Sequence, residues 1–218
     1  MTKSAGLIIN SFECLEYRAF QAILDGQCAP GESVPPVYCI GPVIGGQKGD
    51  WEHQHECMSW LDSQPSGSVL FLSFGSLGVF STKQLKEIAI GLDRSGVNFL
   101  WVVEVLNHDS VGGFVTHCGW NSILEAVYAG VPMLAWPLYA EQKMNKAFIV
   151  DEVKVAFPVA QSEDGSVSAA ELEEQVTELM NWEKGRAVRD RVIAMKAAAS
   201  MIDGGSNSSC TRQVDSVD

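Results

Sequence analysis

The sequence predicts an α/β protein whose core is a Rossmann-like parallel sheet covered by helices on both faces. Two observations predict this fold class. Short apolar runs recur along the 218-residue chain, and segments with apolar residues at helical spacing separate them. The run at 69–74 shows no polar alternation, as expected of a strand that is buried on both faces. Strands that alternate with helices in this way form parallel sheets.

The first part of the chain predicts two short strands and one helix. Strands are expected at 6–11 and 37–40, and apolar residues at helical spacing between them predict a helix that ends at Gly26. Residues 43–67 carry Gly, Gln, Ser and Pro around one short helix expected at 56–61. Such a segment is typical of a linker, so we expect two domains, 1–44 and 45–218.

The pattern is more regular beyond the linker. Strands are expected at 69–74, 99–103, 113–116, 131–136 and 154–159. Helices are expected from Ser81 or Thr82, at 121–129, at 142–150, at 172–180 and at 188–202. The connection between 103 and 113 is too short, because consecutive parallel strands need a crossover of about a dozen residues. Either these two strands are not neighbours, or a segment that normally lies between them is absent.

The overall charge excludes several classes of partner. Lys and Arg number 15 against 27 Asp and Glu, which gives a net charge of -12. A chain this acidic is poorly suited to nucleic acid or to anionic lipid, so any bound phosphate must be held locally by backbone amides. The apolar runs are too short to span a bilayer, and the amino terminus lacks the pattern of a signal peptide.

The cysteines and histidines add two expectations. The six cysteines show no C-x-x-C spacing, which is typical of reduced thiols in a cytoplasmic protein. His53, His55 and Cys57 lie close together but lack a second pair of ligands, so we expect no metal site.

One segment predicts a binding site for a phosphate-bearing ligand. A strand ends at Thr116 and His117, a turn containing glycine follows, and a helix is expected to open at Asn121 and Ser122. The amino end of a helix presents unpaired amides and the positive end of its dipole. The side chains of His117, Asn121 and Ser122 would add donors there. An alternative without ligand is a capping box, because Ser122 and Glu125 satisfy the pattern S-x-x-E.

A second strand-to-helix turn leaves another function open. Residues 74–78 follow a strand and precede a helix, where a dinucleotide would place its phosphates. The fingerprint G-x-G-x-x-G is not met, because Leu77 stands at the second glycine. Glu104 could nevertheless bind the ribose hydroxyls of a dinucleotide, so a dinucleotide-dependent oxidoreductase is kept as an alternative.

The segment 111–142 resembles the signature box of plant family-1 UDP-glycosyltransferases. The residues that carry the resemblance are His-Cys-Gly-Trp-Asn-Ser at 117–122, Glu125, Gly-Val-Pro at 130–132, Trp-Pro at 136–137 and Glu-Gln at 141–142. Trp-Leu-Asp at 60–62, Phe-Gly-Ser at 74–76 and Phe-Leu-Trp-Val-Val at 99–103 also look like that family. The members that act on isoflavonoids, flavonoids or chalcones resemble this chain most.

The resemblance implies a GT-B fold, in which one domain holds the acceptor and the other the UDP-sugar donor. Residues 1–44 would be a remnant of the acceptor domain with its linker, and 45–218 the donor domain. His117, Asn121 and Ser122 match positions that contact the diphosphate, with Ser76 across the cleft.

The remaining matched positions concern the rest of the donor. Glu125 would hold the ribose hydroxyls, and Trp120, Glu141 and Gln142 would meet the sugar, most simply glucose. The implied reaction is an inverting transfer to a hydroxyl of a small plant metabolite such as a flavonoid, with UDP-sugar as co-substrate and no metal.

Two departures from the family pattern leave the activity open. The family box begins with Trp-Ala-Pro-Gln, whereas Val103 here runs straight into Glu104, so a helix and a strand are expected to be missing near 103–104. The catalytic His and Asp of the family have no counterpart, and we transfer their roles to no residue. The chain is therefore either a glycosyltransferase or a non-catalytic truncated fragment that binds a partner.

Overall fold

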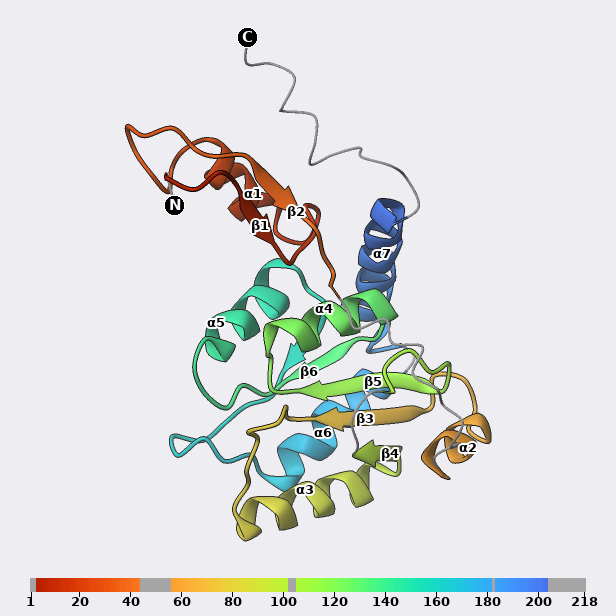
Figure 1. Cartoon of the computed structure of the whole chain (residues 1–218). Coiled ribbons are helices and arrows are strands. Elements are labelled where there is room, and N and C mark those ends of the chain that lie inside the picture. Colours follow the sequence, from red (N-terminus) through yellow and green to blue (C-terminus); the bar gives the residue numbers. More distant parts are fainter. Residues whose placement is uncertain (1–2, 44–55, 102–104, 182, 204–218) are drawn as a thin grey trace. The chain divides into compact units, whose positions relative to one another are not determined.

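The computed structural model describes residues 3–43, 56–101, 105–181 and 183–203 (Figure 1). Contacts divide the chain into two compact units. The first comprises Met1–Gly46 with Met195–Asp218, and the second comprises Gln47–Ala194. The identity of 1–44 as the remnant of an acceptor domain stays a prediction.

The first unit contains a two-stranded parallel sheet. Strand β1 (Leu7–Ile9) pairs with β2 (Val37–Cys39), and helix α1 (Tyr17–Leu24) lies between them in the sequence. Within residues 3–43 the buried apolar side chains come from the β1–α1 turn, from α1 and from the start of β2; they are Phe12, Leu15, Phe20 and Val37.

The second unit is built on a five-stranded sheet in which all neighbours are parallel. Its strands are β3 (Val69–Ser73), β4 (Asn98–Trp101), β5 (Val111–Thr116), β6 (Met133–Ala135) and β7 (Ala156–Pro158). The order across the sheet is β4-β3-β5-β6-β7. Strands β3, β5 and β6 are therefore adjacent, and the loops that follow them emerge at one edge.

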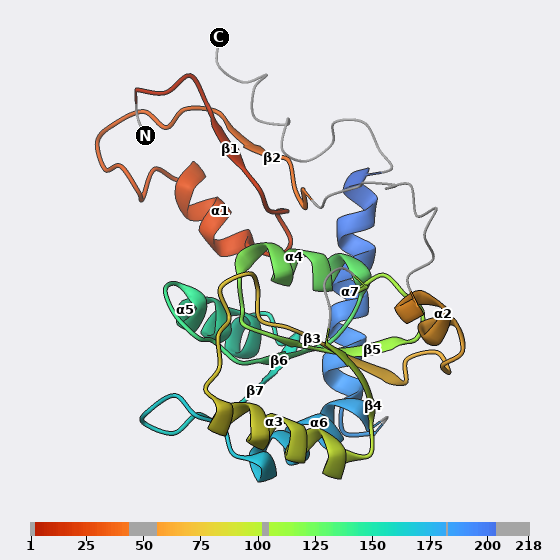
Figure 2. The ribbon, with the colours of Figure 1, turned by 60° about the horizontal axis from the view of Figure 1, so that its bottom comes forward.

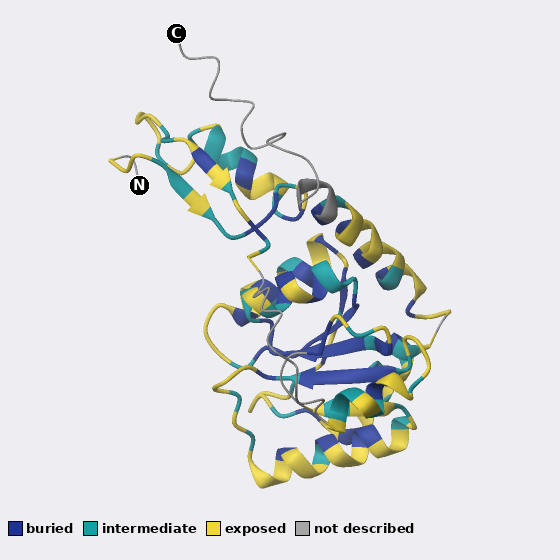
Figure 3. Cartoon of the chain, turned by 45° about the vertical axis from the view of Figure 1, so that its right-hand side comes forward, coloured by how far each residue is buried: buried dark blue, intermediate teal, exposed yellow. Residues whose placement is uncertain are grey.

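Helices cover both faces of this sheet (Figure 2). Helices α3 (Thr82–Ser95) and α6 (Ala169–Met180) lie on one face, and α4 (Trp120–Ala129) and α5 (Gln142–Ala147) lie on the other. Helix α2 (Glu56–Asp62) precedes β3, a π-helical turn (Phe148–Glu152) continues α5, and α7 (Arg186–Asp203) follows α6. The central strands β3, β5 and β6 are buried while the outer helix faces are exposed (Figure 3), so the layers enclose an apolar core.

The strands β4 and β5 are not neighbours, because β3 lies between them. The expectation that these two strands are not neighbours is thus confirmed, although both run parallel to β3, so the connection still has to cross the length of the sheet. Whether a helix and a strand are missing near 103–104 stays a prediction, because residues 102–104 lie outside the described chain. Strand β4 is an edge strand, and Phe99 and Trp101 on it are each 42% exposed.

Several expected boundaries differ from the structure, and three of them lie in the segment from β5 to α5. Strand β5 begins at Val111 rather than at 113, because Val111 already pairs with Val69 of β3. Helix α4 begins at Trp120 rather than at 121, because Gly119 already has the extended backbone of an N-cap. The helix expected at 142–150 changes its hydrogen-bonding pattern at Phe148 and becomes π-helical.

Candidate functional site

The predicted contact residues gather at the carboxyl ends of β3, β5 and β6. Ser76 lies in the loop after β3, and His117 lies in the turn after β5. Glu141 and Gln142 follow β6, at the start of α5. Because these three strands are adjacent and parallel, their following loops meet at one edge of the sheet. This edge is where open α/β sheets bind their ligands.

The turn between β5 and α4 is short and conformationally restricted. Cys118 adopts a left-handed backbone with φ of 64°, which costs an ordinary residue about 1–2 kcal/mol. Its amide donates to Thr116 Oγ1 at 3.2 Å, and its side chain is fully buried. Burial raises the pKa of the Cys118 thiol to about 12, so this sulfur is not a nucleophile.

Helix α4 is not capped by a side chain at its N-cap position. The N-cap residue is Gly119, which has no side chain to accept from the first-turn amides. Ser122 is the third residue of the helix, so the capping box with Ser122 as N-cap is wrong. The structure therefore leaves the side chain of Ser122 in the first turn, where it can serve as a ligand contact.

His117 lies between two glycines. A Cβ added at Gly75 would lie 2.8 Å from His117 Nε2, and one added at Gly119 would lie 2.5 Å from the same atom. Glycine at both positions is therefore what makes room for the imidazole ring. Gly75 also has φ of 68°, which favours glycine for a second reason.

The imidazole of His117 is 8% exposed and its charge is suppressed. Burial lowers the pKa of His117, although the Ser73 backbone and the Glu141 carboxylate oppose this effect. Nδ1 is buried without a hydrogen-bond partner. A neutral ring carries one N–H, and a phosphate oxygen could accept a hydrogen bond from it.

Aromatic packing fixes the loop that carries Ser76. The ring of Phe74 meets Phe80 edge-on, with 4.6 Å between the centroids, and meets Trp136 in the same way at 5.3 Å. Phe74 is 3% exposed, so the loop is anchored just before Gly75. Ser76 itself is exposed beyond this anchor.

The side chains on the first turns of α4 point in different directions. Asn121 and Glu125 are exposed, and Ser122 is half-buried. Ser122 and Glu125 are three residues apart, so they share a face of the helix. The ring of Trp120 packs against that of Phe148, with centroids 6.1 Å apart.

Gln142, which is expected to meet the sugar, is largely buried. It is 3% exposed, and its Oε1 accepts from the amides of Leu138 and Tyr139 at 2.8 and 2.9 Å. The side chain thus holds the loop after β6 in place, and Nε2 is the group it can offer to a ligand. Glu141 is exposed at the N-cap position of α5.

Sequence reasoning missed two residues that support this site. Asn145 Nδ2 donates to the Cys118 carbonyl at 3.0 Å, and Phe148 contacts Trp120. A signal for Asn145 was present, because it is a polar residue that shares a helix face with Ile149. No local pattern in the sequence indicates the contact of Phe148.

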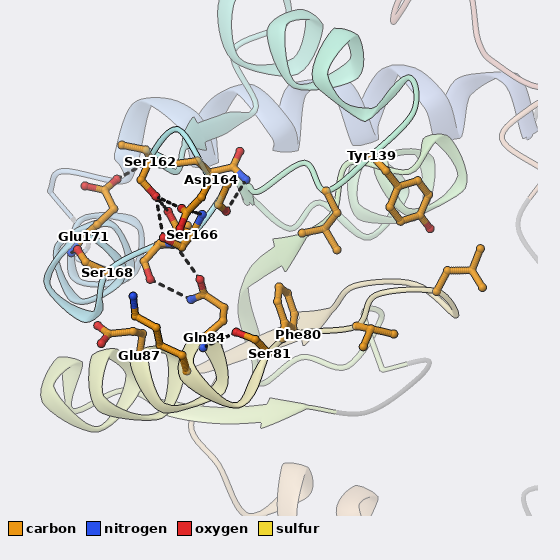
Figure 4. A pocket seen from close by; sticks show the side chains of 18 residues that line it. Phe80, Ser81, Gln84, Glu87, Tyr139, Ser162, Asp164, Ser166, Ser168 and Glu171 are labelled. Carbon is orange, nitrogen blue, oxygen red and sulfur yellow. Dashed lines mark hydrogen bonds between the residues drawn. The ribbon is translucent and has the colours of Figure 1, made fainter.

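A cavity of about 830 Å³ lies on the α3 and α6 side of the same unit (Figure 4). Its described lining includes none of the eight predicted contact residues. Its polar groups bond one another: Ser162 Oγ donates to Asp164 Oδ1 at 2.6 Å, and Gln84 Nε2 donates to the Val167 carbonyl at 2.9 Å. Because these groups already have partners, the end of α4 is the stronger candidate.

The described part of the chain contains neither a cluster of metal ligands nor a helix able to cross a membrane. Within it, no group of three or more His, Cys, Asp and Glu could hold a metal ion. His53 and His55 lie outside the described residues, so the expectation that they form no metal site stays a prediction. None of the described helices is long and apolar enough to cross a membrane.

Comparisons with known proteins agree with one another. The family model of UDP-glucoronosyl and UDP-glucosyl transferase matches residues 102–196. An anthocyanidin 5,3-O-glucosyltransferase of a Rosa hybrid cultivar is 48% identical over 88% of this chain and 49% of the relative. A phloretin 2'-O-glucosyltransferase of Pyrus communis is 44% identical over 100% of this chain and 56% of the relative.

A solved structure gives the same result for the fold. The structure of Phytolacca americana UGT2, complexed with UDP-2fluoro-glucose and pterostilbene, superposes with a TM-score of 0.85 at 39% identity. It covers 94% of this chain and 52% of that chain. The expected parallel α/β fold, one half of a GT-B architecture, is thus confirmed.

The chain spans about half the length of the relatives it matches. The match to the Pyrus communis protein runs over 271 positions, whereas the chain has 218 residues. At least 53 aligned positions (271 less 218) therefore have no residue of this chain opposite them.

Proposed function

Because the chain belongs to the plant family-1 UDP-glycosyltransferases, we propose that it supplies the part of such an enzyme that binds the UDP-sugar donor. The amino end of α4 carries the proposal. It is headed by Gly119, it lies next to the imidazole of His117, and it stands at the carboxyl edge of the sheet. A helix end without a capping side chain is suited to an anion such as a diphosphate.

The diphosphate is assigned to the β5–α4 turn. His117 donates from its neutral ring, and Asn121 and Ser122 add donors from the first turn of α4. Ser76, on the anchored loop after β3, approaches from the neighbouring strand. Because the chain carries a net charge of -12, these local donors must outweigh an unfavourable overall field.

The ribose and the sugar are assigned to the flanking positions. Glu125 lies one turn along α4 from Ser122, and its exposed carboxylate accepts from the ribose hydroxyls. Trp120, Glu141 and Gln142 meet the sugar. Gln142 does so as a donor through Nε2, because its Oε1 already accepts two backbone hydrogen bonds.

The chemistry is an inverting displacement. A hydroxyl oxygen of the acceptor attacks the anomeric carbon of the sugar, the bond from that carbon to the diphosphate oxygen breaks, and UDP leaves with the electron pair. The end of α4 and His117 stabilise the charge that develops on the leaving diphosphate. The acceptor proton passes to a base that we assign to none of the described residues, and we assign no metal.

The acceptor class is proposed from the relatives. Two of them are named for glucosylating an anthocyanidin and phloretin, so we propose a phenolic hydroxyl of a flavonoid-like molecule as the acceptor and glucose as the sugar.

A second candidate is a chain that binds the donor without transferring the sugar. The 53 or more alignment positions without a counterpart favour it, because they are lost inside the matched range. In this case the phosphate contacts of α4 remain, while positioning of the reacting groups is lost.

Calorimetric titration of the purified chain with UDP tests the donor site, and we expect saturable binding that Ser122→Ala weakens. Absence of binding, or binding unaffected by this change, contradicts the donor site. Incubation with UDP-glucose and a panel of flavonoids, followed by mass spectrometry, then separates the two candidates. Glucoside formation establishes transfer, and its absence in a chain that binds UDP establishes the non-catalytic alternative.

A further inference from the structure

Asn145 is a polar residue on the buried face of α5. It is 7% exposed, and it shares this face with Gln142, at 3%, and Ile149, at 0%. A buried side-chain amide is unfavourable unless it is hydrogen-bonded. Its Nδ2 donates to the carbonyl oxygen of Cys118 at 3.0 Å, a residue 27 positions away in the sequence. The bond joins α5 to the turn that leads into α4.

The carbonyl that Asn145 binds belongs to the most constrained residue of this turn. Cys118 has φ of 64° and is 0% exposed, so water does not reach its carbonyl. In a trans peptide the C=O and the next N–H point in opposite directions. The bond from Asn145 therefore also fixes the direction of the Gly119 N–H, which points away from α5 at the head of α4.

We infer that Asn145 is a positioning residue for the UDP-sugar: it holds the Cys118–Gly119 peptide so that the amino-terminal amides of α4 keep their direction toward the diphosphate. This inference rests on the proposed donor site. A second contact joins the same two elements, because the Phe148 ring packs on Trp120 at 6.1 Å. Helix α5 and its π-helical turn thus brace the end of α4 at two points.

The test uses a change that keeps the shape of the side chain and removes its donor. Asn145→Asp places a carboxylate against the Cys118 carbonyl, and we expect UDP affinity to fall about tenfold. Burial raises the pKa of such a carboxyl. The loss of UDP affinity relative to the wild-type chain should therefore become smaller when the pH is lowered from about 7.5 to about 5.5, because the protonated carboxyl donates a hydrogen bond again.

Gln84→Glu is the matched control. Gln84 is 7% exposed and its Nε2 donates to the buried Val167 carbonyl at 2.9 Å, so the same kind of bond is lost away from the α4 end. We expect this change to lower the melting temperature and to leave UDP affinity within about twofold. Equal loss of affinity in both variants overturns the inference, because the effect is then one of stability.

Hydrogen exchange of the backbone amides supplies a readout that does not depend on UDP. In Asn145→Asp the amides of residues 118–122 should exchange faster than in the wild-type chain, and in Gln84→Glu they should not. If the wild-type chain fails to bind UDP, the proposed function fails, and exchange alone decides whether Asn145 positions the helix end. Unchanged exchange in Asn145→Asp overturns the inference in either case.

Discussion

Helices α3 and α4 follow neighbouring strands of one sheet, yet their amino ends are built differently. At α3, Ser81 is the N-cap and its Oγ accepts from the amide of Gln84 at 3.1 Å. At α4 the N-cap is Gly119, which offers no side chain. Helix α6 agrees with α3, because Ser168 Oγ accepts from the amide of Glu171 at 3.2 Å. Helices α1 and α5 also lack a capping side chain, so the open end of α4 fits the proposed binding of a diphosphate only together with His117 beside it.

The largest effect is expected from Gly119→Ala, which puts a methyl group at the open helix end. The new Cβ would lie 2.5 Å from His117 Nε2, so the ring or the turn must move. Overpacking of this kind costs about 1–3 kcal/mol, and we expect UDP affinity to fall about 30-fold together with the melting temperature.

Calorimetry and thermal melts measure both quantities for Gly119→Ala. Adding His117→Ala removes the ring and should restore the melting temperature without restoring the affinity. A double variant that melts as early as Gly119→Ala would show that the clash is not the cause.

The next effect concerns the ring itself. His117→Ala removes a hydrogen bond to a charged phosphate, worth about 1.5–3 kcal/mol, so we expect at least about tenfold weaker UDP binding. His108→Ala is the control, because His108 bonds Ser110 Oγ at 2.8 Å outside the site. Titration of both variants with UDP checks the prediction, and equal affinities for the two would contradict it.

A smaller effect is expected from removing one serine hydroxyl at the capped end of α3 or at the uncapped end of α4. Ser81→Ala removes the cap of α3 and should lower the free energy of unfolding by about 1 kcal/mol while UDP affinity stays unchanged. Ser122→Ala should do the reverse, because Ser122 is not the cap of α4. Urea unfolding and UDP titration of the pair measure both quantities. A loss of stability in Ser122→Ala equal to that in Ser81→Ala would remove the distinction.

The smallest effect is a pH dependence of stability. Burial lowers the pKa of His117 below 6.5 in the folded chain, whereas the unfolded chain binds the proton near that ordinary value. Stability from the neutral ring is therefore present above about pH 6.5 and declines as the pH falls through this value toward the folded pKa. Urea unfolding should show a weaker decline on acidification in His117→Gln. Parallel pH profiles for the two chains would contradict this assignment.

The sequence predicted the elements whose signals are local. Apolar runs located β3 and β6, and helical spacing with Ser81 located α3. The end of α5 was wrong, because the apolar pattern continues through Val150 while the backbone becomes π-helical from Phe148. Periodicity reports which residues face the core, and it does not report which carbonyl each amide binds.

In the candidate site too, the residues connected along the chain were predicted, and those brought in by packing were not. His117, Trp120 and Ser122 were predicted together because they lie on one strand–turn–helix, so their proximity follows from covalent connection. Their individual roles stay predictions. Asn145 and Phe148 were missed, since their contacts with the turn arise only when α5 packs against it. The left-handed backbone of Cys118 was missed as well, because residues other than glycine rarely adopt it and no local pattern signals the exception.

The rate at which the buried thiol of Cys118 is alkylated measures how often this turn opens. With a pKa of about 12 and no exposure, the sulfur cannot react with an alkylating reagent while the turn is closed. Cys14 and Cys28 are exposed and should be labelled at once, and the half-buried Cys39 and Cys57 should follow. The sixth cysteine, Cys210, lies outside the described residues, so the label at Cys118 is followed on its own peptide by mass spectrometry. Its slow appearance measures how often the turn opens, and an occupied site should slow it further.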